Sequence, residues 1–455
     1  MIRAAAYRRR WRPSRYWLAG VLGIATLAVL VVSSVASLAV GPVPLRATVF
    51  GLPAVAFVAA ATALFVRALH DQEPAHRGRD VTRASVLLLI GTFLWLAVID
   101  AYTFTRAAGP GVAAACAAAC LPTTAAGLLI IRRLDRNEKE PWRLVLVATV
   151  WGAIVSTSLA FWGEALWDLL FATSFIPGPA ADASTAYSAG IFEELAKGTA
   201  VLLLYLLMRD EFDDVVDGIV YGAAVGLGFN FMESIGYMTH IYAVLAPEGG
   251  GVGGAAVQWY WRQVIGLFFG HAAYTALIGA GIGIARQLPR LRQRVLVIAC
   301  GFLAAIAAHF AWDAWQALAL TGAKSTAAQL LLAHTRYLFM VGPFVAVLLV
   351  LLAMGLELEG AALTRHLEAE AASGQGAVRP DEVGVLMSPR QRFRARIAAL
   401  AQGGPAAYMH LSRLQTAQLH LAMERWHRER DEIDEPLAAE DALRTQVLRL
   451  RGAIA

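Results

Sequence analysis

Residues 186–208 read AYSAGIFEELAKGTAVLLLYLLM, and this stretch decides how the rest of the chain is interpreted. It is apolar and long enough to cross a bilayer, since a transmembrane helix needs about 20 residues. It nevertheless carries Glu193, Glu194 and Lys197. Ionisable side chains inside a membrane span are costly and usually mark a functional site. The sequence therefore predicts a membrane helix that contributes charged groups to a site.

Three more apolar segments follow before residue 320, and each of them also contains ionisable residues. The second segment holds Glu233, the third holds His271, and the fourth holds His309 and Asp313. We therefore expect a core of four membrane helices arranged around these side chains.

Spacing and depth bring the polar groups of the core together. Glu193 and Lys197 are four residues apart, as are His309 and Asp313, so the members of each pair share one helix face. Counting about 1.5 Å per residue from the expected span ends places the carboxylates and histidines of the four helices roughly 11–16 Å below the outer face. Glu164, near the outer end of the preceding segment, fits an interfacial position better than the site.

The whole chain has the composition of a polytopic membrane protein. It contains 455 residues, of which 58% are hydrophobic and 16% are charged. We expect an all-α, polytopic membrane helix bundle of about ten transmembrane helices, with a helical cytoplasmic C-terminal tail. The expected spans are 17–40, 46–66, 83–104, 109–131, 144–172, 186–208, 215–243, 260–285, 295–320 and 337–356.

These spans divide the chain into four expected parts. Residues 1–185 form an N-terminal membrane domain of about five spans, and residues 186–320 form the core of four spans. Residues 321–356 provide the last span. Residues 357–455, which are rich in Glu, Arg and Ala, form the tail.

The placement of arginine indicates the orientation of the chain in the membrane. Basic residues precede the first span and recur in alternate connectors, whereas 173–185 and 244–259 contain no Lys or Arg. The positive-inside rule then places both termini in the cytoplasm. The basic clusters are read as topology signals, so we expect a lipid bilayer and no nucleic acid as partner. The glycine-rich stretch 244–258 is expected to be an outer loop, either a mobile gate or a linker.

Glycines repeat at four-residue spacing in the second core segment, at Gly218, Gly222 and Gly226. Small residues at this spacing let helix backbones approach closely in lipid. We therefore expect tight helix packing around the polar site.

The combination of glutamates and histidines favours hydrolysis. These side chains suit a divalent metal that activates water, zinc being the best match, with Glu193, Glu233, His271 and His309 as candidate ligands. Alternatively, a glutamate acts directly as the general base, so metal dependence stays open. The sequence has no HExxH, GxSxG or GxxxxGKS motif.

A proton- or ion-coupled transporter is the competing function, because proton relays use the same intramembrane Glu, His and Asp residues. Transporters are often built from repeated halves. The two halves of this chain show no such repeat.

Four short motifs occur in order along the core: IFEELAKGTAV, DDVVDGIVYGAAVGLGFNFMESIGY, GHAAYTALIGAGIG and HFAWD. Together they resemble the PrsW family of bacterial intramembrane proteases, which belongs to the group that includes the CAAX prenyl endopeptidases. The family patterns EExxK, FxxxE, a single membrane histidine and HxxxD are matched by Glu193, Glu194, Lys197, Phe229, Glu233, His271, His309 and Asp313. The chain departs from the family at Asn230 and Ser234, and in its additional N-terminal spans and long tail.

The resemblance implies an intramembrane protease of the bacterial cell membrane that cleaves a membrane-anchored protein. For the founding member of the family it implies site-one cleavage of an anti-sigma factor. Either Glu193 or Glu194 is then expected to activate water, with Lys197 keeping the carboxylates ionised. Glu233 and His271 would act as ligands or assisting groups. His309 with Asp313 would stabilise the oxyanion or complete the ligand set.

Overall fold

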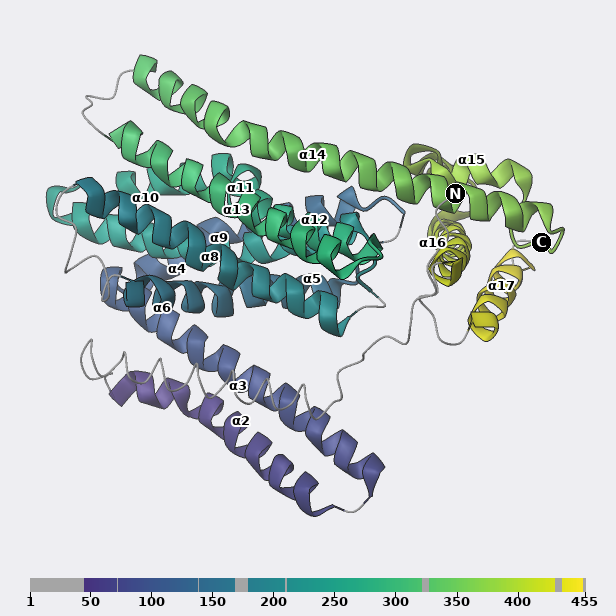
Figure 1. Ribbon diagram of the computed structural model, residues 1–455, viewed down its shortest axis with the longest axis horizontal. Helices are drawn as coiled ribbons and strands as arrows, with labels where there is room; N and C mark the ends of the chain where they lie inside the picture. The colour runs from purple at the N-terminus through teal and green to yellow at the C-terminus, as the bar shows by residue number, and fades with distance from the viewer. Residues whose placement is uncertain are drawn as a thin grey trace.

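The computed structural model describes residues 45–71, 73–137, 139–167, 179–208, 211–320, 327–429 and 436–452. Within these ranges the chain forms helices and no β-strand, as expected for an all-α protein. Figure 1 shows a bundle of long helices that is joined through helix α14 to a separate group of C-terminal helices.

The described helices fall into three parts along the chain. The N-terminal part comprises α2 (Leu45–His70), α3 (Pro74–Ala108), α4 (Pro110–Leu134), α5 (Trp142–Val150), the π-helical η1 (Trp151–Ser156) and α6 (Thr157–Trp167). The central part comprises α8 (Pro179–Leu207), α9 (Val215–Leu245), η3 (Ala246–Glu248), α10 (Gly251–Trp259), the π-helical η4 (Tyr260–Ile265), α11 (Gly266–Phe269), α12 (His271–Gln287) and α13 (Leu291–Leu320). The C-terminal part comprises α14 (Ala327–Ala372), α15 (Pro380–Met387), α16 (Pro389–Glu429) and α17 (Pro436–Gly452).

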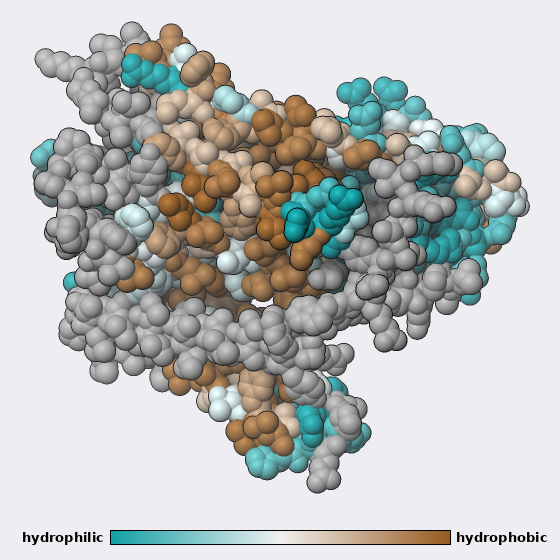
Figure 2. Space-filling view, viewed as in Figure 1, coloured by the Kyte–Doolittle hydropathy of each residue, from teal (hydrophilic) through white to brown (hydrophobic). Residues whose placement is uncertain are grey.

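Seven segments of the described residues are long and apolar enough to cross a membrane. They are His76–Ala108, Pro110–Leu134, Trp142–Trp167, Val215–Glu248, Gly251–Gln287, Leu291–Asp313 and Leu331–Ala372. The first expected span, 17–40, lies outside the described residues, and α8 carries four charged residues, Asp182, Glu193, Glu194 and Lys197. The count of ten therefore stays a prediction. Figure 2 shows hydrophobic residues gathered over the bundle and hydrophilic ones over the end formed by the C-terminal helices.

Helix α9 lies at the centre of the bundle, where it contacts α4, α5, α8, α10 and α12. Its sequence is apolar or glycine on almost every side, which is the pattern of a helix buried all round. Asp214 caps its start, because the Oδ1 atom of Asp214 accepts hydrogen bonds from the backbone N–H groups of Val216 and Asp217 at 2.6 and 3.2 Å. The side chain of Asp217 reciprocates by accepting from the backbone N–H groups of Asp213 and Asp214.

The glycines of α9 allow α12 to approach closely, as expected from their spacing. A Cβ atom at Gly222 would lie 2.4 Å from the carbonyl oxygen of Thr275, and one at Gly226 would lie 2.2 Å from that of His271. No larger side chain fits at these two positions without moving a backbone. The close contact therefore fixes the position of α12 along α9.

The prediction of an outer loop at 244–258 is wrong, because most of this stretch is helical. Helix α9 continues to Leu245, and after a tight turn at Gly249, where φ is +77°, α10 begins at Gly251. Backbone groups at membrane depth need internal hydrogen bonds, and a helix satisfies them even in a glycine-rich sequence. The third core segment accordingly starts earlier than expected, and it is interrupted at Gly270 between α11 and α12.

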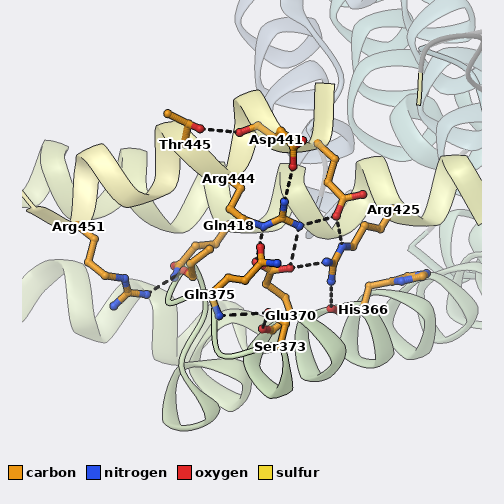
Figure 3. A network of polar contacts seen from close by, with 12 residues as sticks. His366, Glu370, Ser373, Gln375, Gln418, Arg425, Asp441, Arg444, Thr445 and Arg451 are labelled. Atoms are coloured by element: carbon orange, nitrogen blue, oxygen red, sulfur yellow. Dashed lines mark hydrogen bonds and ion pairs between the residues drawn. The ribbon is translucent and has the colours of Figure 1, made fainter. Parts of the chain in front are cut away.

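The tail is helical, as expected, and is held to α14 by a buried ionic network (Figure 3). Helix α14 continues well past residue 356 and carries Glu370 into this region. The guanidinium groups of Arg425 on α16 and Arg444 on α17 contact the Glu370 carboxylate at 2.5 and 2.9 Å. Both arginines also contact Glu440, so the four residues connect three helices. The cytoplasmic location of the tail stays a prediction.

Candidate active site

The polar residues predicted from the sequence meet at one place in the bundle. Helix α8 contributes Glu193, Glu194 and Lys197, α9 contributes Glu233, α12 contributes His271, and α13 contributes His309 and Asp313. All are buried except Glu233 and Asp313, whose side chains are 16% and 20% exposed. The expected convergence of the four core helices is therefore observed among the described residues.

Lys197 occupies the middle of the cluster, with no exposure to solvent. Its Nζ atom lies 2.6 Å from Glu194 Oε1 and 3.1 Å from Glu193 Oε2. It also lies 2.9 Å from His271 Nδ1 and 4.1 Å from the centre of the Phe229 ring. The ammonium group thus neutralises two adjacent carboxylates that would otherwise be buried without a counter-charge.

His271 is the first residue of α12, directly after the break at Gly270. An ammonium group can only donate, so Nδ1 of His271 accepts from Lys197. The other nitrogen, Nε2, lies 2.6 Å from Glu233 Oε2 and donates its proton to that carboxylate. These two contacts fix both the orientation and the tautomer of the His271 ring.

His309 pairs mainly with Glu194 and less closely with Asp313. Its Nδ1 atom lies 2.9 Å from Glu194 Oε1, while its Nε2 atom is 3.6 Å from both Glu193 Oε2 and Asp313 Oδ2. The Tyr274 ring stacks on the imidazole with the ring centres 5.4 Å apart. The expected His309–Asp313 pair therefore exists, but at a distance longer than a hydrogen bond.

Sequence reasoning missed Arg262, which completes the cluster from η4. Its guanidinium group lies 2.7 Å from Glu233 Oε2 and 3.6 Å from the centre of the Tyr237 ring. The residue is buried, with 4% of its surface exposed. An arginine two residues inside an expected span is the signal that would have found it.

Glu164 on α6 also belongs near the cluster, although the sequence favoured an interfacial position for it. The charges of Glu193, Glu233, His309 and Lys197 all act on its carboxyl group. The side chain is partly buried at the edge of the site.

The comparisons with known proteins agree with this arrangement. Residues 140–356 match the family described as "PrsW family intramembrane metalloprotease". This part of the chain is similar to the PrsW family. The matched region contains every residue that forms the cluster, so the expected family resemblance is confirmed.

One curated relative in this family is Protease PrsW from Geobacillus kaustophilus (strain HTA426). It is 31% identical over 146 residues, which cover 31% of this chain and 59% of the relative. The chain therefore matches well under two thirds of the length of that PrsW protein. No solved structure matches the chain.

The donor set of this site fits a metal ion. One ligand atom from each of Glu193, Glu194, His271 and His309 lies within 4.8 Å of the others, and all four residues are buried. Oε2 of Glu194 is buried and has no hydrogen-bond partner among the described residues, so it could act as a ligand. Carboxylate and imidazole together are typical ligands of zinc. The sequence proposed Glu233 in this set, whereas the structure places Glu194 there and pairs Glu233 with Arg262 and His271.

Proposed function

We propose that this chain is an intramembrane endopeptidase that hydrolyses peptide bonds of membrane-anchored proteins. The observation that carries the proposal is the buried cluster of carboxylates and imidazoles inside a helix bundle similar to the PrsW family. A group of this kind has no packing advantage over apolar side chains, because burying charges is costly even when they are paired. Hydrolysis gives each member of the cluster a role.

Glu193 is the residue best placed to activate water. Its side chain is 7% exposed, whereas that of Glu194 is fully buried. Water can therefore reach Glu193 and not Glu194. A carboxylate within hydrogen-bonding distance of a water can take its proton as the water attacks the substrate carbonyl. Glu194 instead orients His309 and holds Lys197 in place.

The remaining residues position the base and stabilise charge. The Lys197 ammonium group favours the ionised form of Glu193, and Arg262 with Glu233 fixes the His271 ring. The Nε2 atom of His309 lies 3.6 Å from both Glu193 and Asp313, and we assign it to stabilise the negative charge that develops on the carbonyl oxygen.

A bound zinc ion would be held by Glu193, Glu194, His271 and His309, and it would supply Lewis-acid activation of water or of the carbonyl group. The chain's own residues bury the donors and exclude bulk water, and His271 would have to give up its contact with Lys197 or Glu233 to hold the metal. We leave zinc as part of the proposal.

The proposed substrate class is a membrane-anchored protein with a span that can enter the bundle, and an anti-sigma factor is the case suggested by the family. The proposed location is the bacterial cell membrane with both termini in the cytoplasm. The family match does not favour the competing proton- or ion-coupled transporter.

The test is cleavage of a reporter fused to a single-span candidate substrate, in cells that express the chain. Wild type should release the reporter, and Glu193→Gln and His271→Ala should lower release at least about 100-fold, the contribution of a positioned base. Glu248→Gln changes an exposed glutamate in η3; it is the matched control and should be fully active. Unchanged release in both site variants at equal expression would overturn the proposal. A zinc chelator in a membrane preparation tests the metal.

A further inference from the structure

We propose that a second divalent-cation site lies where the membrane bundle meets the C-terminal helices, formed by Asp213, Asp214 and Asp217 together with Glu359. All four ligands would be carboxylates. Oxygen ligands of this kind suit a hard cation such as Mg²⁺ or Ca²⁺ and not the zinc considered for the other cluster. This inference is independent of the proposed protease activity.

The three aspartates lie at the start of α9. One carboxylate oxygen from each lies within 4.8 Å of the others, and the residues are 6%, 4% and 8% exposed. The helix cap uses Oδ1 of Asp214 and Oδ2 of Asp217. Capping therefore accounts for two of the three carboxylates, but it does not require a third carboxylate, that of Asp213, in the same place.

Glu359 is the second and independent observation. It is 3% exposed, and neither of its carboxylate oxygens lies within hydrogen-bonding distance of a partner among the described residues, although the Asn137 side chain is close by. A buried carboxylate without a partner is unfavourable and calls for an ion or water that satisfies it. The negative charges of Asp214 and Asp217 act on this carboxyl group.

Helix packing explains why Glu359 faces the aspartates. Gly355, one turn earlier on α14, packs against Val215 and Val216, with Cβ-to-side-chain distances of 3.4 and 3.1 Å. Residues four apart share a helix face. Glu359 is therefore carried on the face of α14 that packs against the start of α9.

Six buried carboxyl groups gather at this junction: Asp135, Glu140, Asp213, Asp214, Asp217 and Glu359. Basic groups act on some of them: Lys139 on Asp135, Arg392 on Asp135 and Glu359, and His427 on Asp213. Both end nitrogens of Arg392 donate to backbone carbonyl oxygens, of Leu386 and Arg136.

A cation at this position would join the two parts of the molecule. Asp213 already contacts His427 of α16, with Oδ2 and Nε2 2.9 Å apart. An ion bound by both Asp213 and Glu359 would link α14 to the start of α9. Through the Asp213–His427 contact it would also link α14 to α16. Occupancy of the site should therefore stabilise the packing of the C-terminal helices on the bundle.

The test is cation binding by the purified full-length protein in detergent, after treatment with EDTA. Radioactive ⁴⁵Ca²⁺ dialysis, with competition by Mg²⁺, measures the affinity, and thermal unfolding with each cation measures stabilisation. His271→Ala provides the background in which the other cluster has lost a ligand. We expect saturable binding that His271→Ala retains and that Glu359→Gln and Asp213→Asn each weaken at least tenfold. Glu357→Gln, an exposed neighbour on α14, is the matched control and should bind like wild type.

A second readout separates a cation site from a merely structural role. Without cation, Glu359→Gln removes one of several repelling charges, so its melting temperature should equal or exceed that of wild type. Added Ca²⁺ or Mg²⁺ should then stabilise wild type and not the variant. Absence of binding in wild type, binding lost in His271→Ala, or equal binding in wild type and Glu359→Gln would each overturn the proposal.

Discussion

Replacement of Gly226 by alanine should separate α9 from α12 and misplace His271. The new Cβ atom would lie 2.2 Å from the carbonyl oxygen of His271 and 2.7 Å from Cα of Ala272. An ordinary contact begins at 3.4 Å, so the start of α12 must move by about 1 Å. A displacement of this size at a catalytic group costs on the order of 100-fold in rate. The overpacking itself should cost about 1–3 kcal/mol of stability.

The assay is the initial rate of substrate cleavage by purified protein, with thermal unfolding measured on the same samples. Gly253→Ala on α10 is the control, because no atom lies within 4 Å of the added Cβ atom. We expect Gly253→Ala to match wild type in rate. A Gly226→Ala variant that cleaves within twofold of wild type would refute the claim that this contact positions His271.

Three further predictions concern charged groups. Lys197→Met leaves Glu193 and Glu194 without their counter-charge, so it should lower the free energy of unfolding by about 3–5 kcal/mol, measured by thermal unfolding. The double variant Lys197→Met/Glu194→Gln should recover part of this stability but no cleavage activity. Arg262→Met frees Glu233 and should slow cleavage about 10- to 100-fold with the fold retained; an unchanged rate would contradict its positioning role. Arg444→Met removes a link in the tail network and should speed limited proteolysis of the C-terminal helices, with fragments of the bundle unaffected.

The site could be predicted largely because each of its residues is ionisable and lies in an otherwise apolar segment. A glutamate, lysine or histidine in an apolar span is visible without any knowledge of the partners it meets. What the sequence could not give is the pairing. Glu194 rather than Asp313 is the closest partner of His309, and this depends on how α8 and α13 are rotated against each other.

The misread features share a physical cause. The glycine-rich stretch before α10 resembles a loop by composition, but backbone at membrane depth is satisfied best by a helix. The third core segment is expected from the sequence to begin at residue 260, which places Arg262 at the end of a span. Arginine is common at span ends, so the sequence does not mark it as a site residue there. The contact between Asp213 and His427 joins residues more than 200 positions apart, and no local pattern encodes such a contact.

The measurement that tests the central claim most directly uses the purified chain and a single-span substrate in the same liposomes, with the products identified by mass spectrometry. The account predicts new peptide termini within or beside the substrate's span, formed by wild type and slowed at least about 100-fold by Glu193→Gln. Substrate that stays intact with wild type, or identical fragments formed at equal rates by Glu193→Gln, would contradict it.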